Sequence, residues 1–161
     1  MPIFHTQYSG KANDQSGKEI SVNPRQVLQM RGPVVQVSVT VAQKISEQLI
    51  QQSIEVPEPV SGWALIDTGA SNTCIDNTIA TNLHLPVIDQ VKMASATHNG
   101  TLSNVYPVFM RFIGVPIEVN AERVIGAELG NQGLIILLGR DLLQNFTMFY
   151  NGITGQITIS A

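Results

Sequence analysis

Asp67 lies at the centre of the stretch ALIDTGAS. An aspartate that directly follows a short apolar run lies at the mouth of a sheet if that run is a buried strand. Gly69 lets the backbone turn closely beside the carboxylate. The Thr68 hydroxyl both donates and accepts hydrogen bonds, which would make the turn rigid. The small residues Ala70 and Ser71 leave room for an extended chain to pass the carboxylate.

A carboxylate in such a turn has two uses. It either accepts backbone N–H groups and stabilises its own turn, or it acts as an acid or base. Hydrolysis by aspartates alone needs two neighbouring carboxylates, because one then stays protonated while the other is ionised. Asp-Thr-Gly occurs once in the chain. Asp76 lacks that turn, and Asp141 is expected to cap the helix that follows it or to pair with a cation. A two-fold homodimer, which presents Asp67 twice across one axis, solves the problem.

The segments before Asp67 predict the elements that position it. Residues 34–41 alternate valine with polar residues, which predicts a half-buried strand. Residues 42–54 change to a helical period, and the two prolines in 56–62 end that helix. Residues 63–66 form a continuous apolar run, which predicts a strand buried on both faces. Asp67 is therefore expected at the end of a buried strand.

The segments after Asp67 continue the pattern. Residues 73–85 predict a short helix from the spacing of their aliphatic side chains. Residues 91–114 predict two strands around a polar tip formed by Thr97, His98, Asn99 and Gly100, with Asn99-Gly100 as the hairpin turn. Further strand is expected over 115–129, followed by a buried strand, a glycine and a short helix over 133–146. A last hairpin is expected over 146–160.

Two motifs in this order carry a resemblance to a known family. ALIDTGAS, followed by IILLGRDLL at residues 135–143, resembles the retroviral-type, or retropepsin-like, aspartic proteases and their bacterial relatives. The hairpin that begins VKMASATHNG lies between them, in the position of the family's flap, which closes over substrate. The resemblance covers residues 33–160, within the accuracy of boundaries read from sequence.

The resemblance implies roles for the individual residues. Asp67 would be the catalytic acid, with Thr68 and Gly69 forming the active-site turn and locking the dimer. Ala70, Ser71 and the hairpin tip, Thr97 to Gly100, would contact the substrate. Gly139, Arg140 and Asp141 would support the turn. The family has an acidic residue where this chain has Ser71, so Arg140 must find other acceptors, either backbone carbonyls or an acid of the partner chain.

Composition narrows the remaining function classes. The chain has 161 residues with 43% hydrophobic and 13% charged, which excludes a disordered chain. Net charge is −3 and the nine basic residues are scattered, so nucleic-acid binding is not expected. No apolar run reaches the about 18 residues of a membrane span, and no secretion signal is visible. The expectations are a cytoplasmic protein with no cofactor and no metal.

These observations combine into one hypothesis. The fold is expected to be a small all-β, retropepsin-like closed or half-barrel with one or two short helices, assembled as a homodimer. Residues 1–32 would form a polar, partly ordered N-terminal extension and residues 33–161 the protease domain. The function would be an aspartic endopeptidase acting on extended peptides. The alternatives are a non-catalytic dimerisation or peptide-binding module of the same fold, and an enzyme that only processes itself within residues 1–33.

Overall fold

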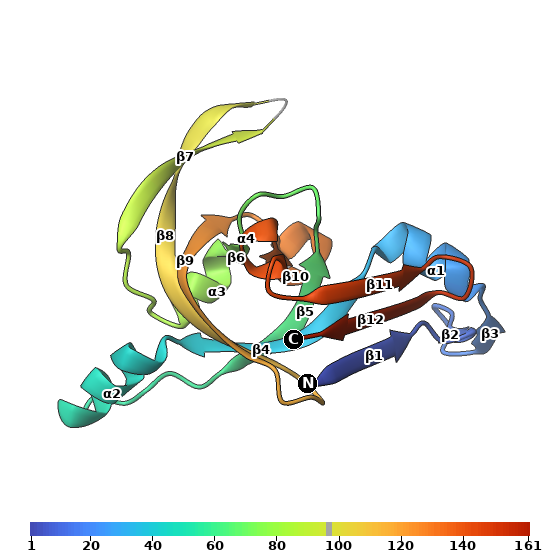
Figure 1. Cartoon of the computed structure of the whole chain (residues 1–161), viewed down its shortest axis with the longest axis horizontal. Coiled ribbons are helices and arrows are strands. Elements are labelled where there is room, and N and C mark those ends of the chain that lie inside the picture. The colour runs from blue at the N-terminus through green and yellow to red at the C-terminus, as the bar shows by residue number, and fades with distance from the viewer. Residues whose placement is uncertain (96–97) are drawn as a thin grey trace.

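Six strands close into a barrel at the centre of the molecule (Figure 1). The computed structural model describes residues 1–95 and 98–161, with the backbone alone for 93–95, 98 and 99. The ring order is β4-β5-β10-β6-β9-β8, and β8 pairs back with β4. Closure removes the free edges within the barrel, while residues 98–104 of β8 extend beyond it and pair with β7 alone. The barrel strands are β4 (Val34–Val41), β5 (Val60–Ile66), β6 (Cys74–Asp76), β8 (His98–Phe112), β9 (Glu118–Ala127) and β10 (Leu134–Leu138).

The alternation along β4 fills the barrel, as the sequence predicted. Val35, Val37, Val39 and Val41 are all at most 2% exposed, because every second side chain of a strand points to the same face. β5 begins at Val60, three residues before the expected strand, and pairs antiparallel with β4 and parallel with β10. The all-β class is therefore confirmed.

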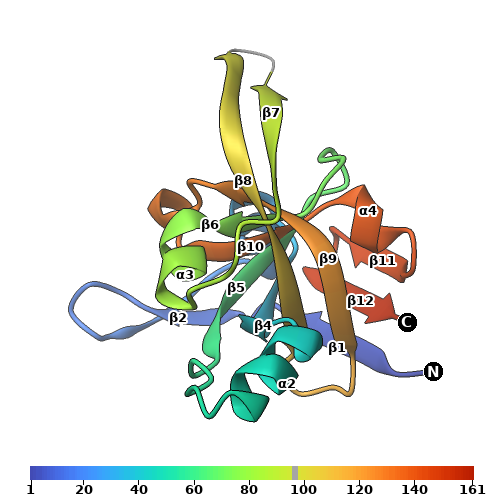
Figure 2. The ribbon, with the colours of Figure 1, turned by 90° about the vertical axis from the view of Figure 1, so that its left-hand side faces the viewer.

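Short helices cover parts of the barrel surface. The described residues form four α-helices, more than the one or two expected, and one 3-10 helix. Figure 2 shows α2, at the predicted place, lying at the lower end of the barrel, on the side opposite the free end of the β7–β8 hairpin. The helices are α1 (Pro24–Arg31), α2 (Gln43–Gln51), α3 (Asn77–Asn82), α4 (Arg140–Leu143) and the 3-10 helix η1 (Gly130–Gln132).

The helix predicted over 73–85 is wrong in its first turn. Cys74–Asp76 form β6, which pairs parallel with β9 and antiparallel with β10. Ile75 is fully buried in that strand, so its spacing from Ile79 matches a helical period only by coincidence. Pairing on both sides decides the conformation here, as tertiary context commonly does for short segments. The helix itself begins at Asn77.

The β7–β8 hairpin projects from the barrel (Figure 2), and its turn differs from the prediction. Asn99 and Gly100 lie within β8, and Ser95 of β7 (Asp89–Ser95) pairs with His98. The predicted turn at Asn99-Gly100 is wrong because the pairing from Asp89 onward fixes a register that carries both residues along the strand. Thr97, expected at the tip, lies outside the described residues.

The N-terminal segment is more ordered than expected. β1 (Ile3–Gln7) pairs with β12 (Gln156–Ser160), and β12 pairs with β11 (Thr147–Asn151), which confirms the predicted last hairpin. β2 (Lys11–Asn13) and β3 (Glu19–Ser21) form a small hairpin. Leu28 of α1 is completely buried in the main core. Polar composition concealed these contacts, because only one side chain of α1 is buried. A domain boundary near residue 32 stays a prediction.

The helices also bear on membrane association. Among the helices of the described residues, none combines the length and the apolar character that crossing a membrane requires.

Candidate active site

Asp67 lies where two parallel strands end. Its backbone N–H donates to the carbonyl of Leu138, the last residue of β10, at 3.0 Å. Ile66 before it is 3% exposed, whereas Asp67 itself is only partly buried. The sequence thus predicted the position correctly: the carboxylate follows a buried strand and stands at the mouth of the sheet.

The turn holds one oxygen of the Asp67 carboxylate. Oδ1 accepts the backbone N–H of Gly69 at 2.8 Å and that of Ala70 at 3.3 Å. A Cβ at residue 69 would stand 3.0 Å from Oδ1, so a side chain there would push against the carboxylate. Oδ2 makes no hydrogen bond with any described residue. The carboxylate therefore stabilises its own turn with one oxygen and leaves the other available for chemistry.

Arg140 stabilises the turn through hydrogen bonds from its side chain and its backbone. Its Nη1 donates to the carbonyls of Thr68 and Gly69, both at 2.8 Å, and its Nη2 donates to the Ser71 hydroxyl at 2.8 Å. The backbone N–H of Arg140 also donates to the Ala70 carbonyl at 3.0 Å. Of the two acceptors expected for Arg140, the structure contains the backbone carbonyls. The planar guanidinium suits this use because it presents several donors in fixed directions.

Asp141 joins α4 to the start of β6. Its Oδ1 accepts the Thr73 hydroxyl at 2.8 Å and the Leu142 N–H at 2.9 Å, and its Oδ2 accepts the Thr73 N–H at 3.0 Å. The buried Thr73 hydroxyl accepts the Gly139 N–H at 3.1 Å. A Cβ at residue 139 would clash with the backbone of Asn72 and Thr73. Asp141 is thus a structural group, but the predicted capping role is wrong: Asp141 lies within α4, whose N-cap is Gly139, and it joins the helix to Thr73.

Asp76 is also occupied by the backbone. The residue is buried, with 4% of its surface exposed. Oδ1 accepts the Thr78 N–H at 2.9 Å, and Oδ2 accepts the N–H groups of Leu129 at 2.9 Å and Gly130 at 2.7 Å. Burial raises the pKa of this carboxyl, but these backbone donors and that of Ile79 outweigh it, so the pKa is lowered. Neither Asp76 nor Asp141 is therefore free to share a proton with Asp67.

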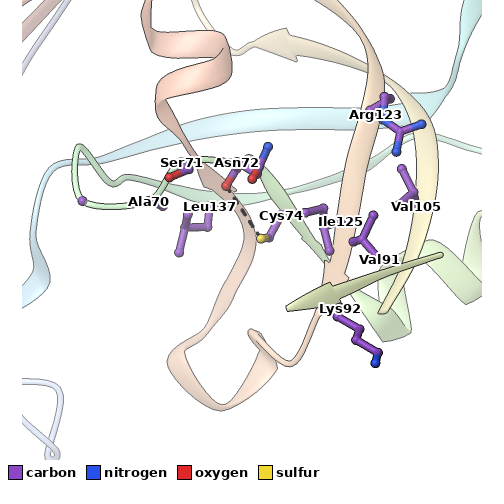
Figure 3. A pocket seen from close by; sticks show the side chains of 11 residues that line it. Ala70, Ser71, Asn72, Cys74, Val91, Lys92, Val105, Arg123, Ile125 and Leu137 are labelled. Carbon is purple, nitrogen blue, oxygen red and sulfur yellow. Dashed lines mark hydrogen bonds between the residues drawn. The ribbon is translucent and has the colours of Figure 1, made fainter. Parts of the chain in front are cut away.

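A cleft of about 520 Å³ opens beside the turn (Figure 3). The turn residues Gly69 to Asn72 border it, and its other walls come from β6, β7, β8, β9 and β10. Four of its wall side chains are aliphatic, and the others are a thiol and two cations. The wall residues are Cys74, Val91, Lys92, Val105, Arg123, Ile125 and Leu137.

Cys74 is the reactive residue type closest to the turn, and its environment makes it unreactive. Burial raises the pKa of the thiol to about 11, and the negative charges of Asp141 and Asp67 act in the same direction. A thiol is a nucleophile only as the thiolate. Cys74 is therefore a small buried residue rather than a nucleophile.

Only some of the predicted site residues lie together at the cleft. Ala70 and Ser71 border the cleft, and Thr68 and Gly69 are exposed beside it. Gly100 is an exposed residue of β8, and the side chains of His98 and Asn99 are not described. The wall residues of β7, β8 and β9 were missed, although the alternation of these strands, read with the correct register, would have placed Val91, Val105 and Ile125 on one face.

The chain matches known proteins at the level of a family. The model of the gag-polyprotein putative aspartyl protease family matches residues 60–145. That range includes β5, the Asp67 turn, the β7–β8 hairpin and α4. No curated protein matches the chain.

Several solved structures are similar to the chain. The protease of EIAV, in complex with an inhibitor, is 18% identical with a TM-score of 0.41, over 70% of this chain and 86% of that one. The retroviral protease-like domain of Ddi1 from Leishmania major is 17% identical with a TM-score of 0.40, over 73% and 81%. A retropepsin-like aspartic protease from Rickettsia conorii is 13% identical with a TM-score of 0.45, over 99% and 94%.

Proposed function

The chain belongs to the gag-polyprotein putative aspartyl protease family, and from this premise we propose that it is an aspartic endopeptidase whose active site forms between two copies. The observation that carries the proposal is the Asp67 carboxylate, with one oxygen fixed by its turn and the other unused among the described residues. It stands beside a cleft bordered by the same turn. Membership of the bacterial branch and a cytoplasmic location stay predictions.

The need for a second carboxylate supports the homodimer. Asp76 and Asp141 are both engaged by backbone and hydroxyl donors of their own chain. The exposed Thr68 and Gly69 leave the turn accessible to a second copy. A two-fold axis beside the turn would bring Asp67 to Asp67 and one Thr68 hydroxyl to the other. The site is half of a symmetric dyad in this proposal.

The chemistry follows from two carboxylates that share one proton. The ionised carboxylate takes a proton from a bound water while the water oxygen forms a bond to the carbonyl carbon of the peptide. The protonated carboxylate donates its proton to the carbonyl oxygen as charge develops there. The carboxylate that took the water proton then gives it to the amide nitrogen, the other carboxylate takes a proton back from a hydroxyl of the tetrahedral intermediate, and the C–N bond breaks to give the free acid and amine. The dyad titrates as a unit, so its two pKa values belong to the pair.

The β7–β8 hairpin is the proposed partner of the substrate backbone. A peptide that lies in the cleft would pair by strand addition with the hairpin tip, Thr97 to Gly100. Hydrophobic residues next to the cleaved bond are the expected preference, and the aliphatic side chains at the end of the cleft beside the turn support it.

Digestion of a peptide library tests this proposal. Wild type should cleave a subset of peptides between acidic and neutral pH, and Asp67→Asn should cleave none while keeping its fold by circular dichroism. Glu58→Gln is the matched control, since it makes the same carboxylate-to-amide change at an exposed residue outside the cleft. It should cleave as wild type does.

Two other outcomes would redirect the assignment. Equal cleavage by wild type and Asp67→Asn would refute the role of Asp67. Peptide binding without cleavage by wild type would identify a non-catalytic peptide-binding module. Mass spectrometry of the incubated chain would reveal self-processing as a cut within residues 1–33.

A further inference from the structure

The end of the cleft away from Ala70 carries an arginine (Figure 3). Arg123 lies on β9 two residues before Ile125, next to a shift in the β8–β9 register, and both residues line the cleft. Ile125 pairs with Cys74 of β6 and with Val105 of β8, which extends this face across the sheet. The result is a wall that is aliphatic beside the turn and cationic at its far end.

Asp89 of β7 holds the guanidinium in place. It is the cross-strand partner of Val105, and its Oδ2 accepts Arg123 Nη2 at 2.6 Å. A guanidinium has five N–H donors. Among the described residues, the Nη2 contact with Asp89 is the one hydrogen bond that Arg123 makes to a carboxylate. The remaining donors are available for a second carboxylate, which an arginine can bind through two N–H groups.

Lys92, the other cation that lines the cleft, is less well placed to bind a carboxylate inside it. Lys92 follows Val91 on β7, and neighbouring residues of a strand point to opposite faces. Figure 3 shows the Lys92 side chain extending away from the aliphatic side chains of the cleft. Arg123 is therefore the cation that lines the cleft together with Val105 and Ile125.

We propose that Arg123 is a specificity-determining residue that selects peptides with a glutamate at the position whose side chain enters this cleft. The inference rests on the proposed function, because it requires that the cleft holds a peptide substrate. Glutamate fits because its methylene groups can lie against Val105 and Ile125 while its carboxylate reaches the guanidinium. The cleft is bordered by Gly69 to Asn72 rather than by Asp67, so the selected residue lies near the cleaved bond and not at it.

The test compares peptides that differ only at this position, once a position-scanning library has located it. Wild type should cleave the glutamate peptide with a kcat/KM about fivefold above the glutamine peptide at low salt, the upper end for an exposed ion pair. The preference should fall as salt screens the charge. Arg123→Gln should cleave both peptides equally, and Arg123→Glu should favour lysine at the same position.

Arg111 supplies a matched control. It lies on β8 in a similarly exposed ion pair, with Nε 2.8 Å from Glu118, and it is not a wall residue of the cleft. Arg111→Gln and Arg111→Glu should keep the glutamate preference, while thermal unfolding shows whether either pair of variants has lost its fold. A wild-type enzyme without glutamate preference, or an Arg123→Gln variant that keeps it, would overturn the inference.

A binding measurement separates this inference from the proposed function. Fluorescence anisotropy of labelled peptides on the Asp67→Asn variant should give a Kd about fivefold lower for glutamate than for glutamine, and an added Arg123→Gln change should remove the difference. If wild type cleaves nothing but this difference is present, the proposed function fails and the specificity stands. If wild type cleaves and the difference is absent, the specificity fails alone.

Discussion

Replacing Asp76 with asparagine tests whether this buried carboxylate of β6 is structural. The Asp76 carboxylate lies between α3 and the start of η1. It accepts the Thr78 N–H in the first turn of α3, and the Leu129 and Gly130 N–H groups where η1 begins. An amide has one accepting oxygen and one donating nitrogen. In either orientation of the new amide, its NH₂ group faces a backbone N–H that the carboxylate had accepted.

The size of the loss follows from these contacts. The better orientation keeps the hydrogen bonds from the Leu129 and Gly130 N–H groups and leaves the Thr78 N–H at the start of α3 without its cap, which costs about 1–2 kcal/mol. The two remaining hydrogen bonds lose the strengthening that a charged acceptor provides. Together these effects should lower the free energy of unfolding by about 3 kcal/mol. For a chain of this size the melting temperature should fall by about 6–12 °C.

The loss should depend on pH in a defined direction. The folded-state pKa of Asp76 is lowered, so ionisation of this group favours the folded state. Its contribution is complete above the unfolded pKa of about 3.9. The contribution disappears as the pH falls through the lower folded pKa. The stability gap between wild type and Asp76→Asn should therefore be full at neutral pH and close in acid.

Differential scanning calorimetry from pH 2 to 7, combined with peptide cleavage below the melting temperature, provides the assay. Asp14→Asn is the control: Asp14 accepts the Ser16 N–H, the Ser16 hydroxyl and the Lys18 N–H, but it is exposed, so water can replace those contacts with a much smaller loss. Asp76→Asn should remain active while folded. Unchanged stability together with abolished cleavage would refute the reasoning, because Asp76 would then be the partner of Asp67.

Two further predictions concern Arg140, which stabilises the Asp67 turn, and Cys74, which lines the cleft. Arg140→Lys should lower kcat by about ten- to a hundredfold with KM and melting temperature little changed, because one ammonium cannot hold the Thr68 and Gly69 carbonyls and the Ser71 hydroxyl together. Arg111→Lys should be neutral in the same steady-state assay, and equal loss in both variants would contradict this role. Cys74 should resist iodoacetamide at pH 8, since its pKa is raised to about 11, and should react rapidly once urea unfolds the chain. Rapid labelling of folded protein at pH 8, followed by mass spectrometry, would contradict the buried thiol.

The sequence predicted the parts of the site that depend on local pattern. The alternation of β4 and the apolar run before Asp67 are properties of single segments, and each gave the correct strand. Gly69 likewise predicted a close turn, and the Gly69 and Ala70 N–H groups donate to the Asp67 carboxylate in that turn.

The features that the sequence did not reveal depend on pairing between distant segments. Ile75 becomes a strand residue because β9 and β10 lie on either side of it. Gly100 lies inside β8 because the pairing with β7 fixes the register. Arg123 lies where the β8–β9 register shifts, and it joins the cleft beside Asp89 of β7. None of these positions follows from the residue type or from its neighbours in sequence.

Subunit mixing tests the shared active site most directly. Wild type and Asp67→Asn would be unfolded together in equal amounts, refolded, and assayed against the best peptide at constant total protein. If each active site needs Asp67 from both copies, only dimers of two wild-type chains cleave, and the activity falls to about one quarter of that of wild type alone. If one chain carries a complete site, the activity falls to about one half, and that result would contradict the dyad.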